Sequence, residues 1–174
     1  MAELKMETDT KLAALARDFH DYLAADNGPG GREKMVERLK PVLTDADFVA
    51  THFEGAGTRK VLYEDPEFGF CILAHNYEGA AESKPHDHGA YWAIYGQAEG
   101  ETEMTEWEVV EPASEDKPGK VKARTVYTMT PGTAYLYNEG ILHSPRRAGA
   151  TRLIRIEGRD MSGIKRLSYE AVES

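Results

Sequence analysis

The sequence predicts a mostly β protein, built as a sandwich or barrel and preceded by a helical segment. Apolar residues near the start of the chain recur with the spacing of a helix face. After Gly55 the apolar and β-branched runs become short and follow one another at intervals of roughly 10–15 residues, with Gly and Pro between them. This rhythm favours antiparallel strands over alternating strands and helices. We expect the helical segment over residues 1–54 and a β-barrel over residues 55–174.

Three helices are expected in the first segment. One apolar face of the first helix is formed by Leu12, Leu15, Ala16, Phe19 and Leu23, with Asp9 or Thr10 as its cap. The Gly- and Pro-rich residues 27–31 should end it. A second helix is expected from Arg32 to Lys40, before Pro41, and a short third one is capped within residues 44–47 and runs through Val49.

Seven strands are expected in the second segment. They are Arg59–Tyr63, Phe68–Tyr77, Tyr91–Gln97, Thr102–Val110, Val121–Met129, Thr133–Tyr137 and Arg152–Glu157. Residues 111–120 contain two prolines and no apolar anchor, which predicts a polar hairpin loop between two of these strands.

Composition limits the function classes. The chain has 174 residues and a net charge of −9, which predicts one domain and disfavours partners such as nucleic acid or an anionic membrane surface. No apolar run is long enough for a membrane span, and Met1–Glu7 lacks the apolar core of a secretory signal. The single cysteine, Cys71, cannot form an intrachain disulfide and is expected to be a buried apolar residue. We therefore expect a cytoplasmic protein.

Histidines provide the clearest chemical signal. His86 and His88 are two residues apart after Pro85, and in a strand two such residues point to the same face, where both rings can bind one metal ion. Asp87 would then point away. An H-x-H pair alone is common by chance. A metal also needs a third ligand from another strand, and His143 is the best candidate, with His75 as the runner-up. His20 and His52, on or near helices, are expected to be exposed.

The arrangement of Gly79, His86, His88 and Gly100 resembles the first motif of the cupin superfamily. The resemblance implies a double-stranded β-helix, also called a jelly-roll barrel, with a metal held inside. Ala93 stands where many cupins have a glutamate ligand, so the resemblance points to the branch that binds metal through three histidines.

Within that branch the chain resembles the thiol dioxygenases, the group of cysteine dioxygenase and 3-mercaptopropionate dioxygenase. Residues 59–66, 85–101 and 135–143 carry this likeness. It implies Fe(II) held by His86, His88 and His143, and O₂ used to oxidise a small anionic substrate that carries a thiol. Ala93 also occupies the position of the crosslinking cysteine of the animal enzymes, so no thioether cofactor is expected. The family's Ser-x-His-x-Tyr run is replaced by Leu153, Arg155 and Glu157.

Candidate residues around the metal follow from strand alternation. Tyr91, Tyr95 and Gln97 share the side of Ala93, so Tyr95 and Gln97 are candidate catalytic donors and Tyr91 is a candidate substrate contact. The tyrosines could instead simply line the core. Arg155 and Glu157 form an i, i+2 pair that faces either the barrel or solvent. If they face inward, both belong to the catalytic site, and Arg155 can grip a substrate carboxylate.

The resemblance further places Arg59 or Lys60 near the family's carboxylate-binding arginine. Other functions remain open. Imidazole ligands also suit Zn or Ni, and Mn is a further alternative, so a non-oxidative isomerase, hydrolase or lyase and a non-catalytic binding protein are the competing hypotheses. The expected partners are a small-molecule substrate and O₂, with a homodimer left open.

Overall fold

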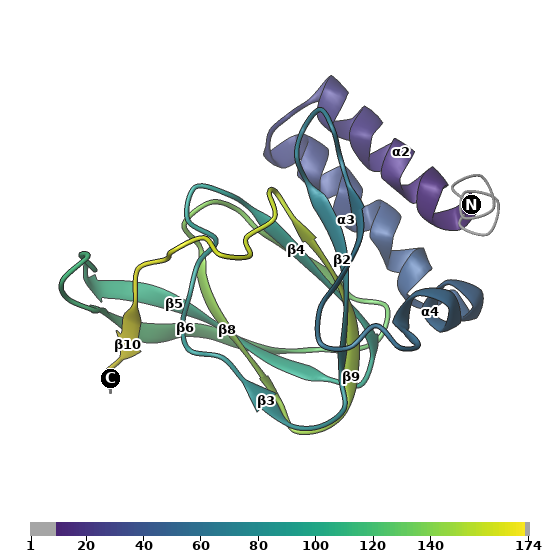
Figure 1. Ribbon diagram of the computed structural model, residues 1–174. Coiled ribbons are helices and arrows are strands. Elements are labelled where there is room, and N and C mark those ends of the chain that lie inside the picture. The colour runs from purple at the N-terminus through teal and green to yellow at the C-terminus, as the bar shows by residue number, and fades with distance from the viewer. Residues whose placement is uncertain (1–9, 173–174) are drawn as a thin grey trace.

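A computed structural model describes residues 10–172 of the chain. Its helices are α2 (Thr10–Ala25), α3 (Pro29–Leu43) and α4 (Ala46–Phe53), which lie together on one side of the molecule (Figure 1). The predicted apolar face of α2 is buried along its whole length. Asp9 and Met1–Glu7 lie outside the described residues. None of the described helices has the length and apolar character that crossing a membrane requires.

The start of the second helix differs from the prediction. Residues 29–31 were expected in a loop, but they form the first turn of α3, with Gly28 as the N-cap. Proline is well suited to this position because the first turn of a helix leaves its N–H groups unpaired. A Cβ atom on Gly31 would lie 2.0 Å from the carbonyl oxygen of Asp26, so glycine lets α3 start tightly against the end of α2. The helix also continues through Pro41 to Leu43.

The strands form two five-stranded sheets within the described residues. The first has the order β1-β2-β9-β4-β7 and the second the order β10-β6-β5-β8-β3. Their bounds are β1 Lys60–Glu64, β2 Cys71–Tyr77, β3 Ala81–Glu82, β4 Ala93–Glu99, β5 Thr102–Glu111, β6 Gly119–Met129, β7 Ala134–Tyr137, β8 Leu142–Arg147, β9 Thr151–Glu157 and β10 Tyr169–Ala171.

All seven predicted strands are present. Three further strands were not predicted, namely β3, β8 and β10. Strand β8 reads LHSPRR, which has no alternation of apolar and polar residues and contains a proline. It is a strand because it pairs with β5 along most of its length. Long-range pairing, rather than local propensity, therefore creates the element that carries His143.

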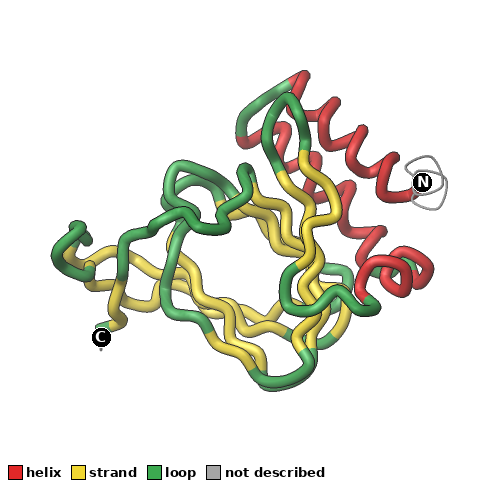
Figure 2. The backbone as a smooth tube through the Cα atoms, in the orientation of Figure 1, coloured by secondary structure: helices red, strands yellow, loops and turns green. Residues whose placement is uncertain are grey.

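The two sheets face each other around the barrel interior (Figure 2), and the helices cover the outer face of the first sheet. Alternate residues of β9 show the two sides. Ile154 and Ile156 pack against the helices, whereas Leu153, Arg155 and Glu157 lie on the opposite face. A second apolar cluster inside the barrel contains Tyr95, Met104, Met129 and Tyr137. The predicted fold class, mostly β with helices at the N-terminal end, is confirmed.

Two histidines predicted to be exposed are not. His52 is only 6% exposed, because it lies on the inner side of α4 with its ring against Phe48. His20 is half-buried and its ring nitrogens lie 2.9 Å from Asp65 and 3.0 Å from Glu67. His20 therefore links α2 to the residues after β1, whereas the ring of His52 packs against its own helix.

Candidate metal centre

Three histidines meet inside the barrel. His86 and His88 lie in the segment between β3 and β4, and His143 lies in β8. The backbones of His86 and His143 donate hydrogen bonds to each other, with N to O distances of 3.0 and 2.9 Å. This isolated bridge corrects the expectation that the H-x-H pair lies in a regular strand. The pair converges because one bridge holds it against β8, and the rest of the segment is not strand.

The ring nitrogens of these three residues lie within 4.8 Å of one another. Two backbone carbonyls orient two of the rings. His86 Nδ1 lies 2.8 Å from the Lys84 oxygen, and His143 Nδ1 lies 3.2 Å from the Ile141 oxygen. In a neutral ring an Nδ1–H donated to a carbonyl leaves the lone pair on Nε2. Both rings are thus held in the tautomer that presents Nε2 to a metal.

Burial keeps the rings neutral. Desolvation lowers the pKa of His86 to about 4 and that of His88 to about 2. The pKa of His143 also falls well below its usual value, first through burial and then through the other two histidines. A metal ion binds neutral imidazole. At neutral pH these rings are already deprotonated, so no proton has to leave before a metal ion binds.

The donor set fits a divalent transition metal. Bonds of about 2.1 Å from one ion to three imidazole nitrogens place these nitrogens at most about 3.6 Å apart, so the most distant pair, now within 4.8 Å, needs to approach by roughly 1 Å. Nδ1 of His88 is buried and has no hydrogen-bond partner among the described residues. A buried nitrogen without a partner is costly, and this cost is offset only where the nitrogen itself binds a group such as a metal ion.

Tyr95 occupies the space beside the ligand atoms. Its hydroxyl lies 3.3 Å from His88 Nε2 and 3.2 Å from His143 Nε2, and its side chain is fully buried. Burial raises the pKa of Tyr95, so it stays a protonated donor. Tyr137 was not predicted as a site residue, but its ring lies 4.3 Å from that of His143 and its hydroxyl contacts that of Tyr127.

Arg155 and Glu157 face the barrel interior. The guanidinium carbon of Arg155 lies 4.5 Å from the centre of the Tyr95 ring, and its Nη1 lies 3.3 Å from Glu157 Oε1. Arg59 reaches the same carboxylate from β1's N-terminal side, at 3.3 and 3.4 Å. The backbone N–H of Met161 also donates to Glu157, at 3.0 Å. The buried carboxylate is therefore fully paired, and it positions both arginines.

Other predicted site residues lie elsewhere. Gln97 is buried, but its side-chain amide accepts a hydrogen bond from Thr102 at 2.9 Å and donates one to the Glu99 carbonyl at 3.0 Å. Tyr91 accepts a hydrogen bond from Arg159 at 3.1 Å, outside the histidine cluster. Lys60 is exposed on β1. The structure thus groups the three histidines with Tyr95, Arg155, Glu157 and Arg59, and it does not bring Gln97, Tyr91 or Lys60 to them.

Two further sequence expectations concern His75 and Cys71. His75, the runner-up ligand, is not in the histidine cluster, and its Nδ1 lies 2.6 Å from the Thr58 oxygen. Cys71 is completely buried, and burial raises the pKa of its thiol to about 12. The thiol is therefore an apolar packing group rather than a nucleophile.

A cavity of about 620 Å³ opens beside the cluster. Its walls include His86, Arg155, Tyr77 and the C-terminal segment 166–170. Arg166 closes one side and donates to the Asp87 carbonyl at 3.1 Å. Tyr77 and Arg166 were not predicted as site residues, because neither stands near a motif in the sequence.

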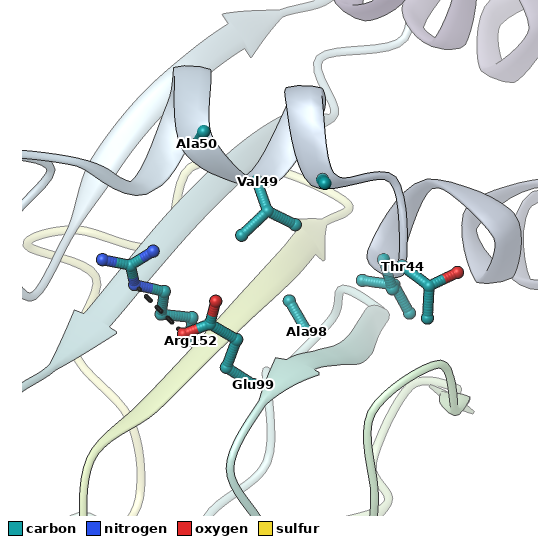
Figure 3. A pocket seen from close by; sticks show the side chains of 8 residues that line it. Thr44, Val49, Ala50, Ala98, Glu99 and Arg152 are labelled. Atoms are coloured by element: carbon teal, nitrogen blue, oxygen red, sulfur yellow. Dashed lines mark ion pairs between the residues drawn. The ribbon is translucent and has the colours of Figure 1, made fainter.

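A second hollow lies outside the barrel, under α4 (Figure 3). It holds about 300 Å³ and contains the ion pair of Arg152 with Glu99 at 3.6 Å. Its lining residues include none of the three histidines and no charged group from the barrel interior. The chemistry therefore concentrates at the first cavity.

Comparison with known proteins gives distant likenesses. No family model matches the sequence, and no curated protein matches it. Among solved structures, the chain is similar to the Schizosaccharomyces pombe Cnp3 cupin domain (15% identity, TM-score 0.44), with 59% of this chain covering 61% of that one. It is also similar to a cupin superfamily protein of Desulfitobacterium hafniense, with 10% sequence identity and a TM-score of 0.42. That match covers 59% of this chain and 76% of that one. A third similar structure is KdgF from a Halomonas species, with 16% sequence identity and a TM-score of 0.42. The match covers 58% of this chain and 77% of that one. These likenesses are distant, so the chemistry of this protein is inferred from its own two facing sheets and its histidine cluster.

Proposed function

We propose that this protein is a metal-dependent cupin dioxygenase that holds Fe(II) and uses O₂ to oxidise a small anionic substrate carrying a thiol. One observation carries the proposal: the ring nitrogens of three histidines, two of them buried, converge beside a cavity whose wall contains His86 and Arg155. The resemblance of the H-x-H segment to the thiol dioxygenases supports iron and O₂ as the reactants.

The side chains divide the work. His86, His88 and His143 would hold the metal, which when bound supplies the redox chemistry that O₂ requires. Three neutral ligands leave the full positive charge of the ion in place, and this charge favours an anionic substrate. Arg155 lies in the cavity wall and can bind a carboxylate, while Glu157 holds its guanidinium in position.

Tyr95 is the candidate proton donor. Its hydroxyl stands 3.2 and 3.3 Å from two ligand nitrogens, so it is within reach of a group bound at the centre. The buried cluster of Tyr95, Met104, Met129 and Tyr137 lies at this end of the barrel and would limit the entry of water. The chain's own contribution is thus to position the substrate, donate a proton and keep the site dry.

A second candidate function is non-oxidative metal chemistry. Imidazole ligands suit Zn and Ni as well as iron. The Ser-x-His-x-Tyr run of the thiol dioxygenases is replaced here by Leu153, Arg155 and Glu157, which changes the surroundings of the metal. A Lewis-acid isomerase, hydrolase or lyase would use the same three histidines.

The deciding experiment is metal analysis followed by O₂ consumption. Protein purified under anaerobic conditions is analysed for metal, reloaded with Fe(II) or Zn(II), and tested in an O₂ electrode with small thiols with and without a carboxylate. We expect stoichiometric iron and thiol-dependent O₂ uptake by the iron form alone. Tight zinc binding with no O₂ uptake for any thiol would reject the dioxygenase proposal and favour the second candidate.

A further inference from the structure

A buried arginine on β8 takes no part in the site described so far. Arg147 follows His143 by four residues in the same strand, so both side chains point to the barrel interior. Its side chain is buried, with the residue only 3% exposed. Its guanidinium carbon lies 4.6 Å from the centre of the Tyr77 ring, and Tyr77 lines the cavity beside the histidines.

The hydrogen-bonding groups of Arg147 are largely unused. Nε and Nη2 are both buried and have no hydrogen-bond partner anywhere in residues 10–172. These two N–H groups lie on the same edge of the guanidinium, and this edge is the one that binds both oxygens of a carboxylate at once. A folded chain seldom leaves two such donors unpaired, since each costs free energy.

The charge around Arg147 is also unbalanced. The groups that act on it electrostatically are Tyr77, Tyr95 and Arg155, and no carboxylate of the described chain is among them. Glu157, a carboxylate of the barrel interior, is already shared by Arg155 and Arg59. Burial lowers the pKa of Arg147, and the nearby Arg155 lowers it further. Arg147 is therefore a buried cation that forms no ion pair with a carboxylate of the described residues.

We propose that the Nε–Nη2 edge of Arg147, above the Tyr77 ring, is a carboxylate-binding subsite of the barrel interior. Resting on the proposed function, the subsite identifies the substrate as a small organic acid with its carboxylate at the end remote from the metal-binding group. Arg155, nearer Tyr95 and the histidines, then serves the part of the substrate close to the metal. The subsite itself needs no metal.

The test measures anion binding to metal-free protein at constant ionic strength. The probes are acetate and propanoate, with propanamide as the neutral control and chloride as the simple anion. The readouts are the ¹⁵N–¹H signal of the Arg147 Nε group, assigned by its absence in Arg147→Lys, and the shift in unfolding temperature. We expect saturable changes with the two acids and none with the amide or with chloride.

Variants locate the binding. Arg147→Met is expected to weaken propanoate binding by about tenfold or more, and Arg147→Lys to weaken it as well, because lysine lacks the paired N–H edge. Arg146→Met is the matched control, since Arg146 is the exposed neighbour on the same strand, and it should leave binding unchanged. Arg147→Lys keeps the buried charge, so it keeps the comparison usable if Arg147→Met does not fold.

Three results would overturn the assignment: no saturable binding of either acid, equal binding of chloride, or loss of binding in Arg155→Met with Arg147→Met unaffected. The experiment involves neither metal nor O₂. Failure of the proposed dioxygenase activity and failure of this subsite are therefore separate outcomes.

Discussion

At the scale of single residues, backbone hydrogen bonds fix the metal centre. The reciprocal bonds between His86 and His143 join two distant segments at the point where both rings enter the barrel. Carbonyls of Lys84 and Ile141 then set the ring tautomers. Because these contacts come from the backbone, replacing a ring should remove a ligand without dismantling the site.

Replacing a ligand histidine should therefore abolish metal retention. We expect His86→Ala and His143→Ala to lose stoichiometric metal while their circular dichroism stays close to that of the wild type. His75→Gln is the control, because His75 is also a buried histidine but lies outside the cluster. Metal bound by either alanine variant at the wild-type level would contradict the ligand assignment.

The role of Arg155 can be separated from that of other arginines on its strand. Arg155→Met should raise KM by roughly tenfold or more, because it removes a charge-assisted bond to the substrate, and should leave metal content unchanged. Arg152→Met is the matched control, since Arg152 lies on β9 but pairs with Glu99 under α4 (Figure 3). Equal KM values for Arg155→Met and the wild type would remove Arg155 from the substrate site.

At the scale of elements, close packing of α3 on β4 supports the strand that carries Tyr95. A Cβ atom on Gly96 would lie 2.9 Å from methyl groups of Leu39 and Leu43, so glycine allows the helix to approach the sheet. The neighbouring residues Ile94 and Tyr95 are completely buried on opposite faces. Strand β4 thus contacts the helical layer with one face and the barrel interior with the other.

A methyl group at this contact should destabilise the fold. We expect Gly96→Ala to lower the free energy of unfolding by about 1–3 kcal/mol, the usual cost of overpacking a core. Gly79→Ala is the control, because a Cβ there meets no atom within 4 Å, and its effect should stay within about 0.5 kcal/mol. Urea unfolding of both variants decides the matter, and equal stability would show that α3 can shift freely.

At the scale of the whole molecule, the barrel buries histidines that the unfolded chain exposes. The pKa of His75 is lowered to about 3, first by burial and then by Arg155. The unfolded state has a histidine pKa near 6.5, so between about pH 6.5 and pH 3 it binds more protons than the native state. Stability must therefore fall as the pH falls through this window.

Removing that histidine should flatten the pH dependence. For metal-free protein we expect the free energy of unfolding of His75→Gln to fall less steeply between pH 6 and pH 4 than that of the wild type. The difference should approach about 1.4 kcal/mol per pH unit for the one titrating group. Urea unfolding at several pH values gives both slopes, and identical slopes would mean that His75 remains protonated in the barrel.

Much of the fold could be predicted because local patterns agree with it. The spacing of Leu12, Leu15 and Phe19 defined the first helix, and the alternation of Ile154 and Ile156 with Arg155 defined β9. Three features were not predicted. They are the first turn of α3, the strand β8 and the burial of His52. Strand β8 depends on its pairing with β5, which is distant in the sequence, and the first turn of α3 depends on the close approach of Gly31 to the Asp26 carbonyl.

By itself the sequence determined the three histidines, the mostly β class and the inward or outward alternation along β9. Only the tertiary structure decided that Arg155 and Glu157 face inward, that Tyr95 stands among the histidine nitrogens and that Arg147 is buried without a partner. The physical reason is that ligand identity is a property of residue type and spacing. Burial and hydrogen-bond pairing depend on segments that meet only when the two sheets close around the barrel interior.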